Sequence, residues 1–576
     1  MKAKKTIQEL KGYPVGLFDE DGYLKLDSNE SDFGPSLKVI EALRQVEPAD
    51  VQYYPFYGKL LQKLADFHKV NIENIILTAG ADEAISSILG TFLEHGQTVL
   101  TVTPSFLMPK IYSKINGINY NEIPYKQKWQ FPTEEFIKNI DSADLIHLTT
   151  PNSPTGEVIE RDVIQKIIKK AGDKAILIDE TYGNYAGITN LSLLKGRENL
   201  FVVRSFSKDF ALAGLRLGYI ISAPQNIKDL RKYLSPYNVS TLTVKAGLAA
   251  LDDIEYFENI KKRMEKSKKI LTDGLKNLAE NIYPSKTNFL CVDFGEKADF
   301  IYQKLLSNKI KVKYFGRPML ETCLRITVPK PENAQKVLDA LKIRSTIVFD
   351  MDGVLFDASK SYRVAVQKTF KHFSGKEAGL DEISAAKKLG GLNNDWDLTE
   401  FLLKKYGFEI NYDKLVKVFQ SYYEKLADIE EPLVKPAFFE NLAKNYDLAI
   451  FTGRLKPEAY FTLDKHGFTK YFHPIVTMED VGLDCQKPDC LGLKIIKKRI
   501  ITDKIYYLGD TVDDMICAAS ADIIGIGVLP PQDKSDELKK LLKSKKAMVV
   551  LDKTEDLTEF MANFERKERK KENAKV

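Results

Sequence analysis

Short apolar segments alternate with longer helical segments along most of this chain. Residues 145–150, 175–180 and 201–206 have the apolar composition of buried strands, and residues 161–172 show the apolar spacing of a helix. Buried strands that are separated by helices are typical of a mostly parallel sheet. The alternation therefore predicts the α/β class.

The chain has 576 residues, which is long enough for several structural units. A long helical stretch after residue 242 precedes strands at 288–294 and 323–328 and a helix at 333–342, which together predict a smaller α+β lobe. A second α/β unit begins at Ser345. Its later strands are expected at residues 447–453, 474–478, 504–510 and 522–528.

The predicted boundaries follow from these changes of pattern. We expect a first unit at 1–343, with its small lobe formed by the N-terminal segment and about 242–343, a second unit at 344–555 with a helical insertion at about 360–440, and a charged tail at 556–576.

Composition limits the function. Lys and Arg number 85 against 80 Asp and Glu, and the net charge of +5 gives no argument for nucleic acid. The five cysteines show no disulfide or zinc spacing. No signal peptide and no run of about 18 apolar residues is present. We therefore expect a cytoplasmic protein that acts on small molecules, without a membrane partner.

The first group of functional residues lies just after predicted strands. Lys208 follows the strand at 201–206, where a lysine can form a Schiff base with an aldehyde cofactor. Ser205, Ser207 and Arg216 supply the hydroxyls and the cation that a phosphate needs.

Other strand ends add to this group. Asp179 can pair with a protonated pyridine nitrogen, and Tyr182 and Asn152 can donate hydrogen bonds to the phenolic oxygen of the ring. Asp82 opens a helix whose backbone N–H groups can bind phosphate, and Phe106 can stack on a pyridine. The simpler alternatives are a strand-end cap for Asp179 and a core aromatic for Phe106.

With these residues in order, 1–343 resembles the fold-type I pyridoxal-phosphate aminotransferases, and among them the histidinol-phosphate aminotransferases. The resemblance is carried by LDSNESDFGPS, YYPFYG, TAGADEAI, TTPNSPTGEVI, ILIDETYGNYA and RSFSKDFALAGLRLGY. It implies pyridoxal 5'-phosphate on Lys208 and a homodimer with shared active sites. The residues that it assigns to cofactor binding are Tyr54 from the neighbouring subunit, Ala81, Asp82, Phe106, Asn152, Asp179, Tyr182, Ser205, Ser207 and Arg216.

The resemblance also implies substrate-binding residues. Arg325 looks like the arginine that binds the carboxylate of glutamate or the phosphate of the alternate substrate, and Asn288 joins it. Lys313 stands where a second arginine is usual, with Arg317 nearby. Threonine-phosphate decarboxylases and small aromatic aminotransferases share most of these motifs and remain alternatives.

A second group of functional residues begins with VFDMDGVLFD, in which Asp350 and Asp352 follow a strand and point the same way. One carboxylate can attack phosphorus while the other acts as acid and base. Asp510 and Asp514 are the further metal ligands, with Asp513 as an alternative to Asp514. Two more residues stabilise the phosphoryl group, and they are Thr452 and Lys487.

Together these residues resemble the motifs of the haloacid-dehalogenase superfamily, in a phosphatase of the phosphoglycolate-phosphatase-like branch with a helical cap. The resemblance implies Mg²⁺ held by Asp350, Asp352, Asp510 and Asp514, an aspartyl-phosphate on Asp350, and Asp352 as acid and base. The cap segment 388–401 is either a specificity loop or a capped helix start with a packed tryptophan. The stretch Asn393, Asn394, Asp395 and Trp396 is dense in polar groups.

The two resemblances together predict a bifunctional enzyme of histidine biosynthesis. The first unit would transfer an amino group from glutamate to imidazole-acetol phosphate, and the second would hydrolyse the resulting histidinol phosphate. In one alternative the phosphatase acts on an unrelated small phosphomonoester. In another, one unit has lost activity and serves as a binding module.

Overall fold

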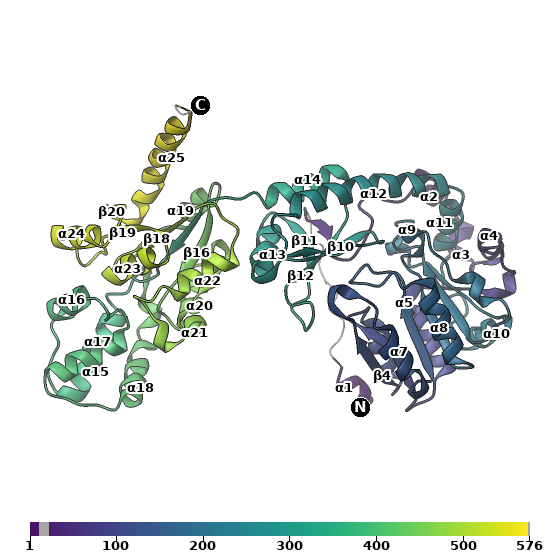
Figure 1. The fold of residues 1–576 in the computed structure, drawn as a ribbon, viewed down its shortest axis with the longest axis horizontal. Coiled ribbons are helices and arrows are strands. Elements are labelled where there is room, and N and C mark those ends of the chain that lie inside the picture. Colours follow the sequence, from purple (N-terminus) through teal and green to yellow (C-terminus); the bar gives the residue numbers. More distant parts are fainter. Residues whose placement is uncertain (11–21, 574–576) are drawn as a thin grey trace. The chain divides into compact units, whose positions relative to one another are not determined.

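The computed structural model describes residues 1–10 and 22–573, with side chains to residue 568. Residues 11–21 and the last part of the predicted tail, 574–576, lie outside the described residues. The chain divides into two compact units, Met1–Leu341 and Lys342–Val576 (Figure 1). No helix in the described part of the chain combines the length and apolarity needed to cross a bilayer.

The first unit is built on a seven-stranded sheet with the strand order β2-β8-β7-β6-β5-β3-β4. All neighbours are parallel except β8, which is antiparallel to β2 and β7. The strands are β2 (Ile75–Thr78), β3 (Thr98–Thr103), β4 (Asn119–Pro124), β5 (Leu145–Thr149), β6 (Ala175–Asp179), β7 (Leu200–Ser205) and β8 (Gly218–Ile221). The predicted α/β class is confirmed.

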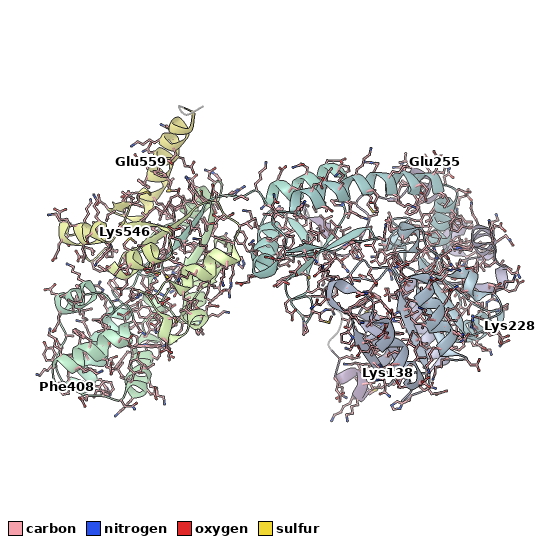
Figure 2. The ribbon with its side chains drawn as sticks, viewed as in Figure 1. Lys138, Lys228, Glu255, Phe408, Lys546 and Glu559 are labelled. Carbon is pink, nitrogen blue, oxygen red and sulfur yellow. The ribbon has the colours of Figure 1, made fainter. Side chains whose placement is uncertain are left out.

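Helices cover both faces of this sheet, which is why its strands are apolar on both sides. Ile176 and Ile178 of β6 pack in one core cluster together with α8 (Arg161–Ala171), while Leu177 between them packs in the opposite cluster with α5 (Gly80–Phe92). Charged side chains such as Lys138 and Lys228 extend outward from the helices (Figure 2). The other helices around this sheet are α1 (Lys5–Gln8), α2 (Leu37–Arg44), α3 (Pro48–Gln52), α4 (Gly58–His68), α6 (Met108–Ile115), α7 (Thr133–Asn139), α9 (Gly183–Ala186), α10 (Pro224–Tyr233) and α11 (Thr241–Leu251).

A smaller five-stranded sheet has the order β1-β11-β12-β10-β9. Its first strand, near the N-terminus, is parallel to β11, while β12 is antiparallel to both β11 and β10. The strands are β1 (Leu24–Leu26), β9 (Asn281–Ile282), β10 (Phe289–Asp293), β11 (Ile310–Tyr314) and β12 (Cys323–Thr327). The helices of this lobe are α12 (Ile254–Leu275), α13 (Ala298–Ser307) and α14 (Pro331–Ala340).

The second unit contains a six-stranded, fully parallel sheet with the order β17-β16-β13-β18-β19-β20. The strands are β13 (Thr346–Phe349), β16 (Asp447–Phe451), β17 (Ile475–Val476), β18 (Ile505–Gly509), β19 (Ile524–Val528) and β20 (Val549–Leu551). Its helices are α19 (Pro436–Leu442), α20 (Lys456–Lys465), α21 (Met478–Val481), α22 (Leu491–Arg499), α23 (Val512–Ser520), α24 (Asp536–Ser544) and α25 (Leu557–Asn573).

The helical insertion forms a cap with its own hydrophobic core. Its helices are α15 (Tyr362–Ser374), α16 (Leu380–Lys388), α17 (Asp395–Lys405) and α18 (Tyr412–Tyr423). The two connections to the sheet pair with each other as β14 (Phe356–Asp357) and β15 (Glu431–Pro432). The predicted end of the insertion at about 440 is too late, because Phe439 and Leu442 of α19 pack in the core of the sheet.

The predicted tail at 556–576 also needs correction. Its first part is helix α25, and Leu557 and Met561 of this helix pack in the same core as the sheet. The apolar residues at the start of the segment therefore make it part of the folded unit, although its composition is dominated by charge.

Gly218 offers a test of how tightly β8 packs against the start of α5. A Cβ atom on Gly218 would lie 2.5 Å from the carbonyl carbon of Gly80, which is backbone and cannot move aside. We expect Gly218→Ala to destabilise the first unit by about 1–3 kcal/mol. Urea unfolding followed by Trp129 fluorescence in a Trp396→Phe background measures this unit alone, because the chain has 2 tryptophans.

The control is Gly214→Ala, since a Cβ atom at Gly214 has no atom within 4 Å. Equal stability of the two variants would contradict the close approach of β8 to Gly80.

Candidate active sites

The predicted lysine and its partners meet at the carboxyl ends of β5, β6 and β7, which are neighbours in the large sheet. Asp179 is the last residue of β6 and is aligned with Thr149 and Val203 of the flanking strands. Lys208 follows β7, and its Nζ donates to the carbonyl oxygen of Ser28 at 2.7 Å. Burial, together with the charge of Arg325, lowers the pKa of Lys208 to about 8. A larger fraction of this amine is therefore neutral near pH 7 than for an ordinary lysine.

Asp179 is a buried carboxylate whose described hydrogen bonds come from one neutral residue. The backbone N–H and the hydroxyl of Thr181 donate to its Oδ1 at 2.9 and 2.6 Å. Burial raises the pKa of Asp179 to about 6. A protonated pyridine nitrogen would supply the missing positive charge, so this position fits the ring of pyridoxal phosphate.

Ala81 and Asp82, which are predicted to bind the cofactor phosphate, lie in the first turn of α5. The guanidinium of Arg216 contacts Asp82 Oδ2 at 3.0 Å, and a Cβ atom on Gly80 would lie 2.7 Å from Arg216 Nη2. Glycine thus lets the arginine lie over the helix N-terminus. The N–H groups of this turn and the guanidinium suit a dianionic phosphate. Ser205 ends β7 and Ser207 follows it, and the backbone N–H of Ser207 donates to Ser205 Oγ at 3.1 Å.

Tyr182 and Asn152 are both buried and hydrogen-bonded. Asn29 Nδ2 donates to Tyr182 Oη at 2.7 Å, and Ser105 Oγ donates to Asn152 Oδ1 at 2.7 Å. Phe106, next to Ser105, is partly buried and packs against the core cluster under α5. These contacts agree with the simpler interpretation of Phe106 as a core aromatic residue. Its stacking on a pyridine ring stays a prediction.

The residues predicted for substrate binding lie on the small lobe. Lys313 on β11 is aligned with Arg325 on β12, so the two cations are on one face. Arg325 Nη1 donates to Ser153 Oγ at 3.0 Å. Asn288 Oδ1 is buried with no hydrogen-bond partner among the described residues. This set fits an anionic substrate group next to the predicted lysine.

Tyr54 is exposed and stacks on the ring of Tyr237 with centroids 4.3 Å apart. Its predicted role, reaching a neighbouring subunit, stays a prediction.

The second candidate site lies beyond β13 and β18, which are adjacent and parallel. Asp350, Asp510 and Asp514 each offer a carboxylate oxygen, and these three oxygens lie within 4.8 Å of one another. The Nζ of Lys487 is 2.8 Å from Asp350 Oδ1 and 2.8 Å from Asp514 Oδ1, and its side chain is buried. The cluster therefore contains three carboxyl groups and one lysine ammonium group.

The pKa values of these acids reflect, above all, burial, with smaller effects from neighbouring charges. Burial raises the pKa of Asp350 to about 7 and the pKa of Asp510 well above its ordinary value. Burial acts in the same direction on Asp514, but Lys487 and the hydrogen bonds of Thr511 and Tyr507 hold its pKa below the ordinary value. A divalent cation would offset the remaining charge, and carboxylate oxygens suit Mg²⁺.

Asp513 and Asp514, between which the sequence spacing did not choose a metal ligand, face different parts of the structure. Asp513 accepts a hydrogen bond from the backbone N–H of Gly391 in the cap at 2.9 Å, so it faces the cap, and Asp514 lies in the cluster. The carboxylate of Asp352, predicted as a metal ligand, lies outside this cluster and instead contacts Arg454 Nη2 at 2.5 Å.

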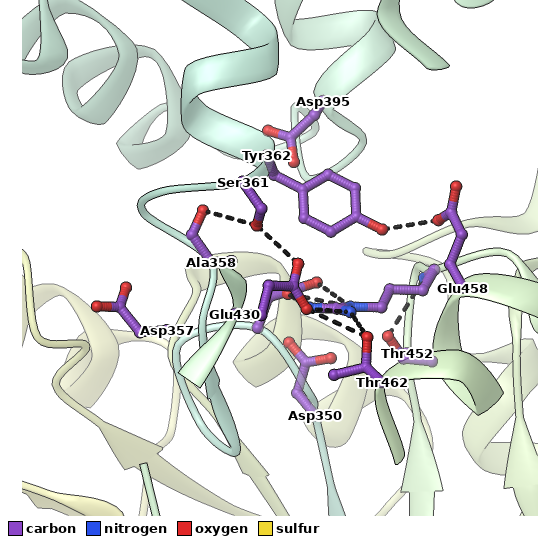
Figure 3. A network of polar contacts seen from close by, with 12 residues as sticks. Asp350, Asp357, Ala358, Ser361, Tyr362, Asp395, Glu430, Thr452, Glu458 and Thr462 are labelled. Carbon is purple, nitrogen blue, oxygen red and sulfur yellow. Dashed lines mark hydrogen bonds and ion pairs between the residues drawn. The ribbon is translucent and has the colours of Figure 1, made fainter. Parts of the chain in front are cut away.

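Arg454 connects Asp352 to the cap connections, and sequence analysis missed this residue. Its guanidinium is buried and also contacts Glu430 Oε2 at 2.8 Å. Glu430 in turn accepts hydrogen bonds from Ser361 at 2.6 Å and from Thr462 at 3.2 Å (Figure 3). Glu430 precedes β15 and Ser361 precedes α15, so this network joins the two segments that lead into and out of the cap. The signal in the sequence is the arginine two residues after Thr452.

A cavity with about 1020 Å³ of space, including its mouth, lies between cap and core. Asp350, Thr452 and Lys487 line it from the core. Asn393, Asn394, Asp395 and Trp396 line it from the cap. Asn394 also caps α17 and the Trp396 side chain packs in the cap core, as the capped-helix interpretation expects, while the role of this segment in specificity stays a prediction.

Comparison with known proteins identifies both units. Residues 21–341, more than half of the chain, match the family "Aminotransferase class I and II". The chain belongs to this aminotransferase family. Residues 347–528 match "Haloacid dehalogenase-like hydrolase". The predicted pyridoxal-phosphate aminotransferase unit, followed by a haloacid-dehalogenase-like unit, is thereby confirmed.

Individual relatives of this aminotransferase cover the first unit. Histidinol-phosphate aminotransferase 1 of Carboxydothermus hydrogenoformans is 33% identical over 343 residues, which are 59% of this chain and 97% of that protein. Histidinol-phosphate aminotransferase of a Thermoanaerobacter species is 36% identical over 324 residues, 55% of this chain and 92% of that protein. The structure of histidinol-phosphate aminotransferase from Sinorhizobium meliloti in complex with pyridoxal-5'-phosphate is 25% identical, with a TM-score of 0.55, and covers 59% of this chain and 96% of that one.

Arg454 in the hydrolase unit of this aminotransferase gives a stability test. Arg454→Met removes the positive charge between two carboxylates, so we expect a loss of about 3–5 kcal/mol. Arg499→Met is the control, because Arg499 is 41% exposed and lies 4.0 Å from Asp480. It should cost less than about 1 kcal/mol. Urea unfolding followed by Trp396 in a Trp129→Phe background reads this unit, and similar losses in both variants would contradict the network.

Proposed function

We propose that this chain is a bifunctional enzyme of histidine biosynthesis. Its first unit transfers an amino group from glutamate to imidazole-acetol phosphate, and its second unit hydrolyses the histidinol phosphate that results. One observation carries the proposal: two units with related chemistry are joined in one chain. The first unit is similar to histidinol-phosphate aminotransferases over nearly their whole length. The second holds a buried Asp350–Lys487 site that suits phosphate esters.

In the first unit, bound pyridoxal phosphate supplies an electron sink. Asp179 keeps the ring nitrogen protonated, and the turn at Asp82 with Arg216 holds the phosphate. Lys208, with its pKa lowered to about 8, anchors the cofactor and moves a proton at the substrate carbon. Arg325 and Lys313 bind the carboxylate of glutamate and the phosphate of the other substrate in turn.

In the second unit, Asp350 attacks phosphorus, so that a bond from its oxygen to phosphorus forms while the bond to the alcohol oxygen breaks. Asp352 gives a proton to the departing alcohol and then takes one from the water that releases inorganic phosphate and restores Asp350. Lys487 stabilises the charge on the phosphoryl oxygens. Asp350, Asp510 and Asp514 would hold Mg²⁺, which would add positive charge beside the phosphoryl oxygens.

The proposal includes a homodimer. Tyr53, Tyr54 and Phe56 are large hydrophobic side chains exposed on one short segment, which suits a surface that a second copy covers.

The first test is phosphate release by the purified chain from histidinol phosphate, beside a panel of common phosphomonoesters, with Mg²⁺ and with a chelator. We expect a preference for histidinol phosphate, and a fall of more than about 100-fold without the cation. Preference for another ester would remove the phosphatase step from the proposal and leave the transferase step in place.

The second test separates the two sites. Lys208→Ala should lower transamination by at least about 1000-fold while phosphate release stays unchanged, and Asp350→Asn should do the reverse. Each variant is the control for the other. If either substitution lowers both activities equally in a folded protein, the two-site proposal is wrong.

A further inference from the structure

A carboxylate in the cavity of the second unit receives its hydrogen bonds from neutral donors. Glu458 lies in the first turn of α20, and Tyr362 Oη donates to its Oε2 at 2.7 Å (Figure 3). The Gln420 amide and the backbone N–H of Leu455, at 3.4 Å, are its other described donors. Burial raises the pKa of Glu458, because neutral donors offset only part of the cost of burying its charge.

The nearest cation does not balance this carboxylate. Arg454 acts on Glu458 through its charge, but its guanidinium already contacts Asp352 and Glu430. One guanidinium therefore lies near three carboxyl groups and contacts only two of them, Asp352 and Glu430. Among the other cations of the cavity wall, Lys487 and Lys387 pair with carboxylates, whereas the described partner of Arg363 is neutral. Lys387 lies 2.9 Å from Asp395, and Arg363 donates to the hydroxyl of Ser384 at 3.0 Å.

Gln420 supplies an independent observation. Its Nε2 points to Glu458, which fixes the orientation of the amide. Its Oε1 is buried and has no hydrogen-bond partner among the described residues. An unpaired acceptor beside a carboxylate that lacks an ion pair fits a ligand that carries both N–H donors and positive charge.

Glu458 and Gln420 line the same cavity as Asp350 and Lys487. We propose that Glu458, Gln420 and Tyr362 form a subsite for a protonated nitrogen on the alcohol part of the phosphate ester. The inference rests on the proposed phosphatase function and defines its substrate class as phosphomonoesters that carry an ammonium or imidazolium group. Trp396 and Phe419, which also line the cavity, give the carbon skeleton an apolar wall.

The test uses the full-length chain with Mg²⁺ and two synthetic esters of equal size, 4-aminobutyl phosphate and n-pentyl phosphate. They differ by an ammonium in place of a methyl group. Glu458→Gln should lower kcat/KM for the amino ester by about 10- to 100-fold and leave the pentyl ester within about threefold. The control is Glu440→Gln, since Glu440 also accepts a tyrosine hydroxyl, from Tyr471 at 2.9 Å, but lies exposed outside the cavity wall.

An equal fall for both esters would overturn the subsite, because it would mean that Glu458 only positions Arg454 and Asp352. No change for either ester would overturn it as well. Hydrolysis of the pentyl ester shows that the variant is folded. If Glu458→Gln unfolds, Gln420→Leu gives the same comparison, and we expect it to show a smaller selective loss for the amino ester.

The wild-type chain separates this inference from the proposed function. Preference for the amino ester without hydrolysis of histidinol phosphate would leave the subsite standing and remove the histidine assignment. Hydrolysis of histidinol phosphate with equal rates on the two synthetic esters would remove the subsite and leave the histidine assignment standing.

Discussion

Parallel strand pairing is the constraint on which both sites depend. In a parallel sheet all carboxyl ends lie at one edge, so residues far apart in the sequence meet there once the strands are in register. Asp179 at the end of β6 and Lys208 beyond β7 are brought to the same edge in this way, as are Asp350 and Asp510 just beyond β13 and β18. The apolar faces that hold each sheet between helices therefore also fix the positions of the acids and lysines at its edge.

Both sites hold buried charge that the protein's own side chains balance only in part. Asp179 receives hydrogen bonds from Thr181, and in the cluster of Asp350, Asp510 and Asp514 the first and the last share Lys487. Unbalanced buried charge is unfavourable, and a cationic ring nitrogen or a divalent ion that enters such a place gains strong binding without displacing a protein partner. Such buried charge therefore lowers the stability of the ligand-free chain and raises its affinity for a cationic ligand.

The sequence predicted the parts of the fold and sites that depend on local pattern. Lys208 and Asp179 were found because they lie at or just beyond the carboxyl ends of buried apolar strands. The pairing of Arg454 with Glu430 was not predicted, because it depends on how the connections of the cap lie against the sheet. The end of the cap was misplaced for a related reason, since α19 has the same helical spacing as the cap helices and only tertiary packing shows which core it joins.

Helix α23 begins with two acids that have different tasks, and its N-terminal cap keeps them apart. The hydroxyl of Thr511 accepts from the backbone N–H of Asp514, and the Asp514 carboxylate accepts from both donors of Thr511. Each residue of an α-helix is rotated by about 100° from the one before it. A shift of the helix sequence by one residue would turn the side chains by that angle. An insertion would bring Asp513 to the place of Asp514 beside Lys487, whereas a deletion would bring Asp514 to the place of Asp513 beside the cap. The capping box therefore sets the rotational phase of the helix, on which the division of labour between these neighbours depends.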